Sequence, residues 1–358
     1  MASKRISFRK RLALEIIRQA RKDIVRQHTL TTLFWECTLR CNAACRHCGS
    51  DCKASPEGND MPVADFLKVI DTITPHVNPH KVFVIFTGGE ALVRNDIELC
   101  GIELYHRGYP WGIVSNGYLL TAERLLSLRK AGLHAMTISL DGFAEAHDWL
   151  RRVPNGFQKA TEAIRLLVHT TDVVWDVVTC ANQQNIDTLT DFKEYLINLG
   201  VRDWRIFTIF PIGRAAENPE LQLSDEQFTS LLQFIADTRK EGRIKVSYGC
   251  EGFLGGYEAE VRNTFYHCEA GITVGSILHD GSISACPSIR ADYSQGNIYN
   301  DDFWTVWNDK FEPFRDRSWM KKGICADCKM FRYCEGNGFH LRDEKGDLLI
   351  CHYNRLVR

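Results

Sequence analysis

Three cysteines stand close together within residues 35–48. Cys41, Cys45 and Cys48 follow the spacing C-x3-C-x2-C. Three thiolates in so short a loop can hold three irons of one cubane iron–sulfur cluster, and the fourth iron then has no cysteine from this segment. An iron left open in this way can bind a substrate or cofactor, as the open position of a catalytic zinc site does.

The alternative interpretation of this triplet is a zinc knuckle or a set of buried thiols. Structural zinc sites usually pair their ligands as C-x2-C, with a second pair far away in the sequence. A compact triplet is unusual for zinc, so the spacing favours the iron–sulfur cluster.

A second set of cysteines gathers in the C-terminal region. Cys268 is followed after twelve residues by Gly281, and after four more by Cys286. A later block has the spacing C-x2-C-x5-C and is followed by one more cysteine: Cys325, Cys328, Cys334 and Cys351. The alternative interpretation of this later block is a structural zinc site.

Composition narrows the class of protein. The 358 residues include 44 basic and 45 acidic side chains, so no nucleic-acid binding is expected. The 14 cysteines are too few for a small disulfide scaffold. They are clustered and no signal peptide precedes them, which favours reduced, metal-binding thiols in the cytoplasm. No apolar run approaches the roughly 20 residues that a transmembrane segment needs.

Six apolar segments alternate with helical patterns before residue 212. Continuous apolar strands joined by helices predict a parallel sheet covered by helices. Ligands of such sheets gather at the carboxyl ends of the strands. The expected strands are 31–36, 81–86, 111–115, 135–140, 173–180 and 203–210, and the expected helices are 62–73, 97–106, 122–131, 157–169 and 189–199.

Polar motifs follow the second, third and fourth of these strands, and Ser115 and Asn116 end the third. In Gly88-Gly89-Glu90, two glycines let the backbone approach a ligand, and a carboxylate can pair with an ammonium group. A glycine pair alone usually indicates a turn. After the fourth strand, Ser139 can donate to a carboxylate and Asp141 can accept from sugar hydroxyls; the alternative is an ordinary turn with Asp141 as helix cap.

The triplet and these motifs resemble the radical S-adenosylmethionine (SAM) superfamily, whose cysteine motif is C-x3-C-x-aromatic-C, with His47 in the aromatic position. The resemblance covers roughly residues 30–212 and implies a partial (βα)6 barrel. It implies a [4Fe–4S] cluster whose open iron chelates SAM. One electron, from a flavodoxin or ferredoxin-type reductant, then cleaves SAM to methionine and a 5′-deoxyadenosyl radical.

The resemblance also assigns SAM contacts. In the family, the GGE motif receives the amino group, and a motif like Ser139-Leu140-Asp141 contacts the carboxylate and ribose. Arg151 matches a recurrent H-D-x-x-R segment and could clamp the SAM carboxylate; the alternative is a surface ion pair with Asp148. The implied contacts are His47, Gly88, Gly89, Glu90, Ser115, Asn116, Ser139, Asp141 and Arg151.

The C-terminal cysteines resemble the SPASM domain, a small loop-rich domain with auxiliary clusters. Its pattern is C-x9–15-G-x4-C, then C-x2-C-x5-C-x3-C, then C. Segment 276–286 contains His279-Asp280-Gly281, a turn signal that predicts a β-hairpin like the one in the family. The resemblance implies that the second auxiliary cluster is complete, with the ligands Cys325, Cys328, Cys334 and Cys351.

The first auxiliary cluster is short of ligands, because Gly338 replaces one cysteine of the pattern. Cys268 and Cys286 remain, and Cys250 is a plausible third ligand. A three-cysteine cluster would leave an iron open. The alternatives are a lost cluster or a non-cysteine ligand such as His267.

We expect four regions: a basic amphipathic helix in 1–29, the barrel in 30–215, a linker helix in 216–245 and the SPASM-type domain in 246–358. The first helix has Ala13, Ile17, Ala20 and Ile24 at helical spacing. It either docks on the barrel or binds an acidic peptide or a membrane surface. So short a region before the barrel predicts no leader-peptide recognition domain.

The resemblance implies hydrogen abstraction from a peptide or protein side chain, giving a crosslink, thioether or oxidation, assisted by one or two auxiliary clusters. One alternative is radical chemistry on a small molecule such as a tetrapyrrole. Another is an iron–sulfur electron carrier, which would need neither the Gly88–Glu90 nor the Ser139–Asp141 motif. Possible general bases are Asp176, Tyr118 and Tyr266.

Overall fold

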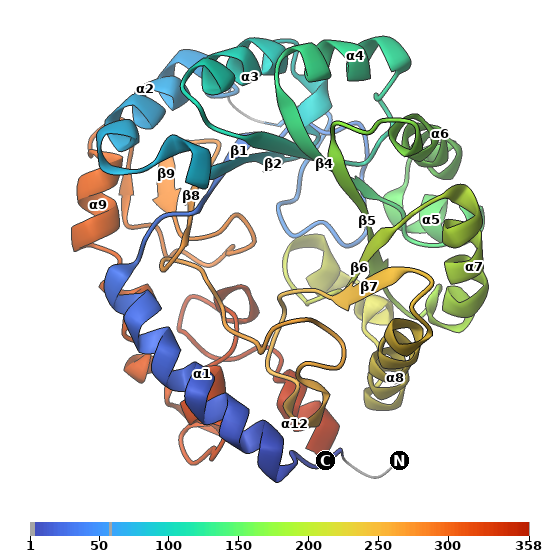
Figure 1. Ribbon diagram of the computed structural model, residues 1–358, viewed down its shortest axis with the longest axis vertical. Coiled ribbons are helices and arrows are strands. Elements are labelled where there is room, and N and C mark those ends of the chain that lie inside the picture. The colour runs from blue at the N-terminus through green and yellow to red at the C-terminus, as the bar shows by residue number, and fades with distance from the viewer. Residues whose placement is uncertain (1–3, 57–58, 358) are drawn as a thin grey trace.

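A ten-stranded sheet organises the computed structural model, which describes residues 4–56 and 59–357. Its strands lie in the order β10-β9-β8-β1-β2-β3-β4-β5-β6-β7 and curve around a central space, with helices on the outside (Figure 1). The six expected strands pair in parallel at its centre, which confirms the α/β partial barrel. They are β1 (Thr32–Thr38), β2 (Phe83–Gly88), β3 (Trp111–Ser115), β4 (Leu133–Ser139), β5 (Val174–Ala181) and β6 (Asp203–Thr208).

Helices follow most of these strands. The helix that carries Arg151, α5, was not expected as a separate element. The helices of the barrel are α2 (Val63–Ile73), α3 (Ile97–His106), α4 (Ala122–Lys130), α5 (Ala144–Arg151), α6 (Gly156–Val168), α7 (Leu189–Leu199) and α8 (Asp225–Glu241).

Aromatic packing holds β1 in place just before the cysteine triplet. Trp35 is fully buried and stacks on Phe66 of α2, with the ring centroids 4.3 Å apart. Phe86 of β2 meets Trp35 edge to face at 5.5 Å. Such contacts fix the position of the strand, so the loop that follows begins from a rigid element.

The sheet extends beyond the six expected strands on both sides. On one side, α8 leads into β7 (Lys245–Tyr248), which pairs in parallel with β6, so residues 216–245 connect two neighbouring strands. On the other side, β8 (Val274–Ile277) pairs in parallel with β1. β8 also forms the expected hairpin with β9 (Ser282–Ser284), and β10 (Gly296–Asn297) follows. The C-terminal region therefore shares the sheet of the barrel.

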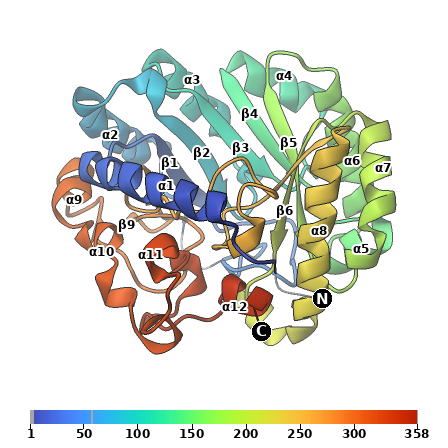
Figure 2. The ribbon, with the colours of Figure 1, turned by 60° about the horizontal axis from the view of Figure 1, so that its bottom comes forward.

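The basic N-terminal segment forms α1 (Phe8–Gln27), but its buried face departs from the predicted apolar face. Ala13 and Ile17 are half-buried and Ala20 and Ile24 are exposed. The buried residues of the helix are Leu14 and Arg21. Leu14 packs with aromatic residues of the C-terminal region, and Arg21 donates to two backbone carbonyls there. Both views show α1 on the same side of the molecule as the C-terminal helices α11 (Phe331–Cys334) and α12 (His352–Val357) (Figures 1 and 2).

None of the helices formed by the described residues is both long enough and apolar enough to span a membrane.

Candidate active site

The cysteine triplet lies in a loop that begins where β1 ends. Hydrogen bonds between backbone atoms close this loop at its base, from Cys41 to the carbonyl of Lys53 (2.8 Å) and from Lys53 to the carbonyl of Leu39 (3.2 Å). Cys45 is buried, and Cys41 and Cys48 are half-buried. The backbone N–H of Cys52 donates to Sγ of Cys48 (3.4 Å), and hydrogen bonding from Cys52 lowers the pKa of Cys48 against the effect of burial. Cys52, for which the cysteine pattern predicts no ligand role, therefore lies beside the triplet.

Arg214, which follows β6, holds this loop from the opposite side of the barrel and was missed by the sequence analysis. Its Nε donates to the carbonyl of Cys45 (2.8 Å), and its Nη1 donates to the carbonyl of Cys52 and to Asp51 (both 2.9 Å). Its backbone N–H donates to the carbonyl of Cys48 (3.0 Å). The only sequence signal was an arginine just after a strand end.

A cavity of about 170 Å³ lies between this loop and the ends of the central strands. It brings together the triplet and eight of the nine predicted SAM contacts; Asp141 lies beneath it. The buried Nδ1 of His47 has no hydrogen-bond partner among the described residues, as expected where a cofactor belongs. The lining includes Cys41, Cys45, His47, Cys48, Cys52, Gly88, Gly89, Glu90, Ser115, Asn116, Ser139, Arg151 and Arg214.

Glu90 is buried at the inner end of this cavity. Its carboxylate accepts hydrogen bonds from the backbone of Leu92 (3.1 Å), from the hydroxyl of Ser115 (2.8 Å) and from the backbone of Asn116 (2.7 Å). Burial raises the pKa of Glu90, and these three donors oppose the rise. Glu90 therefore joins the ends of β2 and β3, and it presents a carboxylate to the cavity.

Asp141 and Arg151 form a buried ion pair, with Arg151 Nε 2.6 Å from Asp141 Oδ2. Burial favours protonation of Asp141, but Arg151, His47 and His147 lower its pKa to about 2. Asp148, the alternative partner of Arg151, instead accepts from the backbone of Phe157 (2.7 Å). The other oxygen of Asp141 accepts from the backbone of Cys180. Arg151 lines the cavity, whereas Asp141 does not. The role of Asp141 is therefore to position Arg151.

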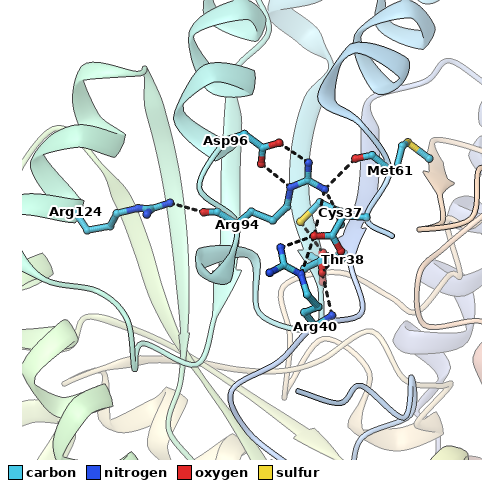
Figure 3. A network of polar contacts seen from close by, with 9 residues as sticks. Cys37, Thr38, Arg40, Met61, Arg94, Asp96 and Arg124 are labelled. Atoms are coloured by element: carbon cyan, nitrogen blue, oxygen red, sulfur yellow. Dashed lines mark hydrogen bonds and ion pairs between the residues drawn. The ribbon is translucent and has the colours of Figure 1, made fainter. Parts of the chain in front are cut away.

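A second buried arginine supports the start of the cysteine loop (Figure 3). Arg94 donates through Nη1 to the carbonyls of Cys37 (2.7 Å) and Met61 (3.0 Å), and it pairs with Asp96 through Nε and Nη2. Arg124 of α4 donates to the carbonyl of Arg94. The end of β1 is thus tied to two neighbouring βα units.

Glu36, on β1, connects the barrel to the C-terminal region. Its fully buried carboxylate accepts from Arg290 (2.8 Å) and lies 3.1 Å from the ring of His279 in the β8–β9 turn. Burial opposes ionisation of Glu36, but His279 and Arg290 lower its pKa overall. The loop with the SAM-type triplet and the C-terminal cysteines therefore have fixed relative positions.

The four cysteines predicted for the second auxiliary cluster line one cavity of about 100 Å³. Most of the other lining is apolar, including Phe253, Met330 and Leu348. A cluster here would lie mainly against apolar side chains. The cysteines in this cavity are Cys325, Cys328, Cys334 and Cys351.

The cysteines predicted for the first auxiliary site have less regular surroundings. Cys268 and Cys286 are half-buried, and Cys250 is exposed. Among the described residues, no three His, Cys, Asp or Glu side chains converge tightly enough to hold one metal ion. A cubane binds its thiolates on separate irons, so its ligands lie farther apart than those of a single ion.

Comparisons with known proteins place these sites in a family. Profiles of the Radical SAM superfamily and of the SPASM iron–sulfur cluster-binding domain match residues 35–196 and 268–329. Mycofactocin maturase MftC of Mycolicibacterium smegmatis is 30% identical over 322 residues, 85% of this chain and 76% of the relative. AdoMet-dependent heme synthase of Oleidesulfovibrio alaskensis is 28% identical over 349 residues, which cover 89% of this chain and 86% of the relative. Fe-coproporphyrin III synthase of Methanosarcina barkeri is 23% identical over 347 residues, which cover 87% of this chain and 83% of the relative.

A solved structure of anSMEcpe with bound AdoMet and a peptide has the same fold, with a TM-score of 0.70 at 19% identity, covering 92% of this chain and 94% of that one. The chain belongs to the radical SAM superfamily and carries a C-terminal SPASM domain. It is a radical SAM enzyme whose cofactors are SAM and [4Fe–4S] clusters.

Arg214→Met should make the SAM-binding cluster easier to lose. The substitution removes the side-chain hydrogen bonds that Arg214 donates to two carbonyls of the cysteine loop and to Asp51. Bonds from a charged donor contribute about 1.5–3 kcal/mol, so we expect roughly tenfold faster removal of iron by a chelator. Anaerobic chelation kinetics measure this. Arg152→Met, at an exposed arginine after α5, is the control. Equal rates in all three proteins would contradict this role of Arg214.

Proposed function

We propose that this radical SAM enzyme abstracts hydrogen from a tetrapyrrole, in place of the peptide or protein side chain that the sequence analysis favoured. The observation that carries the proposal is the nearly full-length similarity to relatives named as heme and Fe-coproporphyrin III synthases. The heme synthase matches over larger shares of both chains than the maturase does. When bound and reduced, SAM and its cluster would supply the 5′-deoxyadenosyl radical.

A cleft of about 470 Å³ offers a place for such a substrate. It is bounded by Gly49 of the cysteine loop and by Gly213, which precedes Arg214. A Cβ atom on Gly213 would lie 2.5 Å from the carbonyl oxygen of Gly49, so these two walls touch. A ligand in the cleft would therefore lie beside the loop that holds the SAM-binding cluster. Ligand pockets typically measure about 300–1,000 Å³, which includes this volume.

The lining suits a flat apolar ring that carries carboxylates. Pro211, Ile212 and Leu349 supply apolar surface, and Arg290 and Lys345 supply positive charge. Arg290 already pairs with Glu36, and Asp343 and Glu344 also line the cleft. Lys345 is exposed and makes no ion pair within the described residues, so it is available to a substrate carboxylate.

The second candidate substrate is a peptide. It is favoured by the 30% identity to a maturase and by the fold shared with anSMEcpe, whose structure holds a peptide.

The test is an anaerobic assay with reconstituted enzyme, SAM and reductant. We expect Fe-coproporphyrin III to bind with a shift of its Soret band and to change mass only when SAM is present, with one 5′-deoxyadenosine formed per abstraction. Lys345→Glu should weaken porphyrin binding several-fold, because it puts a negative charge beside the substrate carboxylates. Lys329→Glu, an exposed lysine outside the cleft, is the control. No binding and no mass change, with turnover of a peptide instead, would overturn the proposal.

A further inference from the structure

Gly338 stands where the SPASM pattern has a ligating cysteine, and the space beside it is already filled. A Cβ atom added to Gly338 would lie 2.5 Å from Cε1 of His340 and 3.0 Å from Oη of Tyr266. A cysteine would therefore not fit without movement of its neighbours. The volume of the missing thiolate is occupied by an imidazole and a phenol.

The hydroxyl of Tyr266 has an unusual environment. The residue is only 3% exposed, and its Oη has no hydrogen-bond partner among the described residues. A buried tyrosine hydroxyl usually finds a partner, and leaving it without one costs about 1–3 kcal/mol. This oxygen therefore indicates a group that the protein's own atoms do not supply.

Other buried polar atoms next to Cys268 are also unpartnered. Within the described part of the chain, both ring nitrogens of His267 and Nη1 of Arg317 lack hydrogen bonds. Arg317 also donates through Nη2 to the carbonyl of Cys268 (2.6 Å). So many unsatisfied polar atoms at one place are rare in folded proteins. An anionic group, such as a thiolate-ligated iron–sulfur cluster, would account for them.

Tyr266 lies beside the cysteines that remain at the first auxiliary site. Its side chain belongs to a buried cluster with Phe253, and Cys268 packs against this cluster. Cys286 packs, like Cys268, against the main core, and Cys250 lies three residues before Phe253 in the sequence. The phenol of Tyr266 and the thiol of Cys268 therefore meet in one buried cluster.

We propose that the phenolic oxygen of Tyr266 is the fourth ligand of the first auxiliary cluster, together with Cys250, Cys268 and Cys286. The phenol would bind iron as the phenolate, with its hydroxyl proton given up to solvent. Each of the four irons would then have a protein ligand, so this cluster would serve electron transfer and not the binding of substrate. The inference rests on the SPASM domain and not on the identity of the substrate.

Two histidines compete for this role. The three atoms nearest to a Cβ on Gly338 belong to His340 and Tyr266, and none belongs to His267. His340 packs against the ring of Phe210, with the centroids 4.9 Å apart, and none of its atoms is among the unpartnered buried polar atoms. Of the two groups that meet the position of the missing thiolate, only Tyr266 has an unsatisfied buried atom.

The test uses the full chain with Cys41, Cys45 and Cys48 replaced by Ala, so that iron remains only at auxiliary sites. We expect about eight irons per chain and resonance-Raman bands of an iron–tyrosinate bond. Adding Tyr266→Phe, which removes one oxygen, should abolish these bands and lower the count towards about four. Tyr293→Phe, whose hydroxyl donates to the carbonyl of Asp343, should change neither and is the matched control.

Three outcomes would overturn the proposal: about four irons in the parent protein, a spectrum unaffected by Tyr266→Phe, or a nitrogen hyperfine coupling that disappears with His267→Ala or His340→Ala. These readouts are independent of the porphyrin assay. If the porphyrin assay fails and the tyrosinate bands are present, only the proposed substrate is overturned. If the porphyrin reacts and the tyrosinate bands are absent, only the proposed role of Tyr266 is overturned.

Discussion

The chain with Cys41, Cys45 and Cys48 all replaced by Ala is expected to form no 5′-deoxyadenosine from SAM. These cysteines line the cavity that also holds Glu90 and Arg151, so they are the thiolates placed to hold a cluster beside SAM. Without a cluster, no electron reaches the sulfonium, and cleavage should fall to the uncatalysed background. Quantifying 5′-deoxyadenosine after anaerobic reconstitution measures the effect.

Iron content is the control for this experiment. The variant should lose about four irons and keep its auxiliary iron, because the C-terminal cysteines lie in separate sites. Thermal unfolding near that of the parent protein would show that the fold survives. SAM cleavage at the parental rate would instead assign the active cluster to other residues.

Glu90→Ala should weaken SAM binding about 10-fold to 100-fold while leaving the iron content nearly unchanged. The estimate follows from the loss of a charge-assisted hydrogen bond of about 1.5–3 kcal/mol. The structure adds a second reason, because Glu90 also anchors Ser115 and Asn116, which line the same cavity. Equilibrium binding of SAM to the reconstituted protein measures the change.

The control for Glu90 is Glu145→Ala, which removes an exposed glutamate from α5, outside the cavity. Its SAM dissociation constant should equal that of the parent. An unaltered constant in Glu90→Ala would show that the carboxylate neither contacts SAM nor positions the residues that do.

The barrel was predictable because its strands are long apolar segments between regular helices. Two further features of the same sheet, one strand and one strand pairing, were not predicted. In β7, only Val246 and Tyr248 are buried, so four residues carry too little pattern. The β8–β9 hairpin was expected, but not its pairing with β1, which joins residues more than two hundred positions apart in the sequence.

The residues of the site could be predicted where they belong to a recognisable sequence motif. What spacing cannot show is which side chains meet after folding. Arg214 contacts a loop more than 160 positions earlier, and Arg151 pairs with Asp141 rather than with Asp148 on its own helix. For α1, periodicity selected Ala20 and Ile24, whereas distant carbonyls bind Arg21 in the buried face.

The contacts of α1 and β1 have a consequence for how the protein is made. Arg21 binds the carbonyls of Tyr266 and Tyr333, and Leu33 of β1 pairs with Gly275 of β8. A ribosome adds about 5–20 residues per second, so the first segments wait on the order of tens of seconds for their partners. During that time the cysteine loop is unprotected on a nascent chain. Delivery of iron and sulfide to this loop is therefore best timed after release from the ribosome, when β1, at whose end the loop begins, has paired with β8.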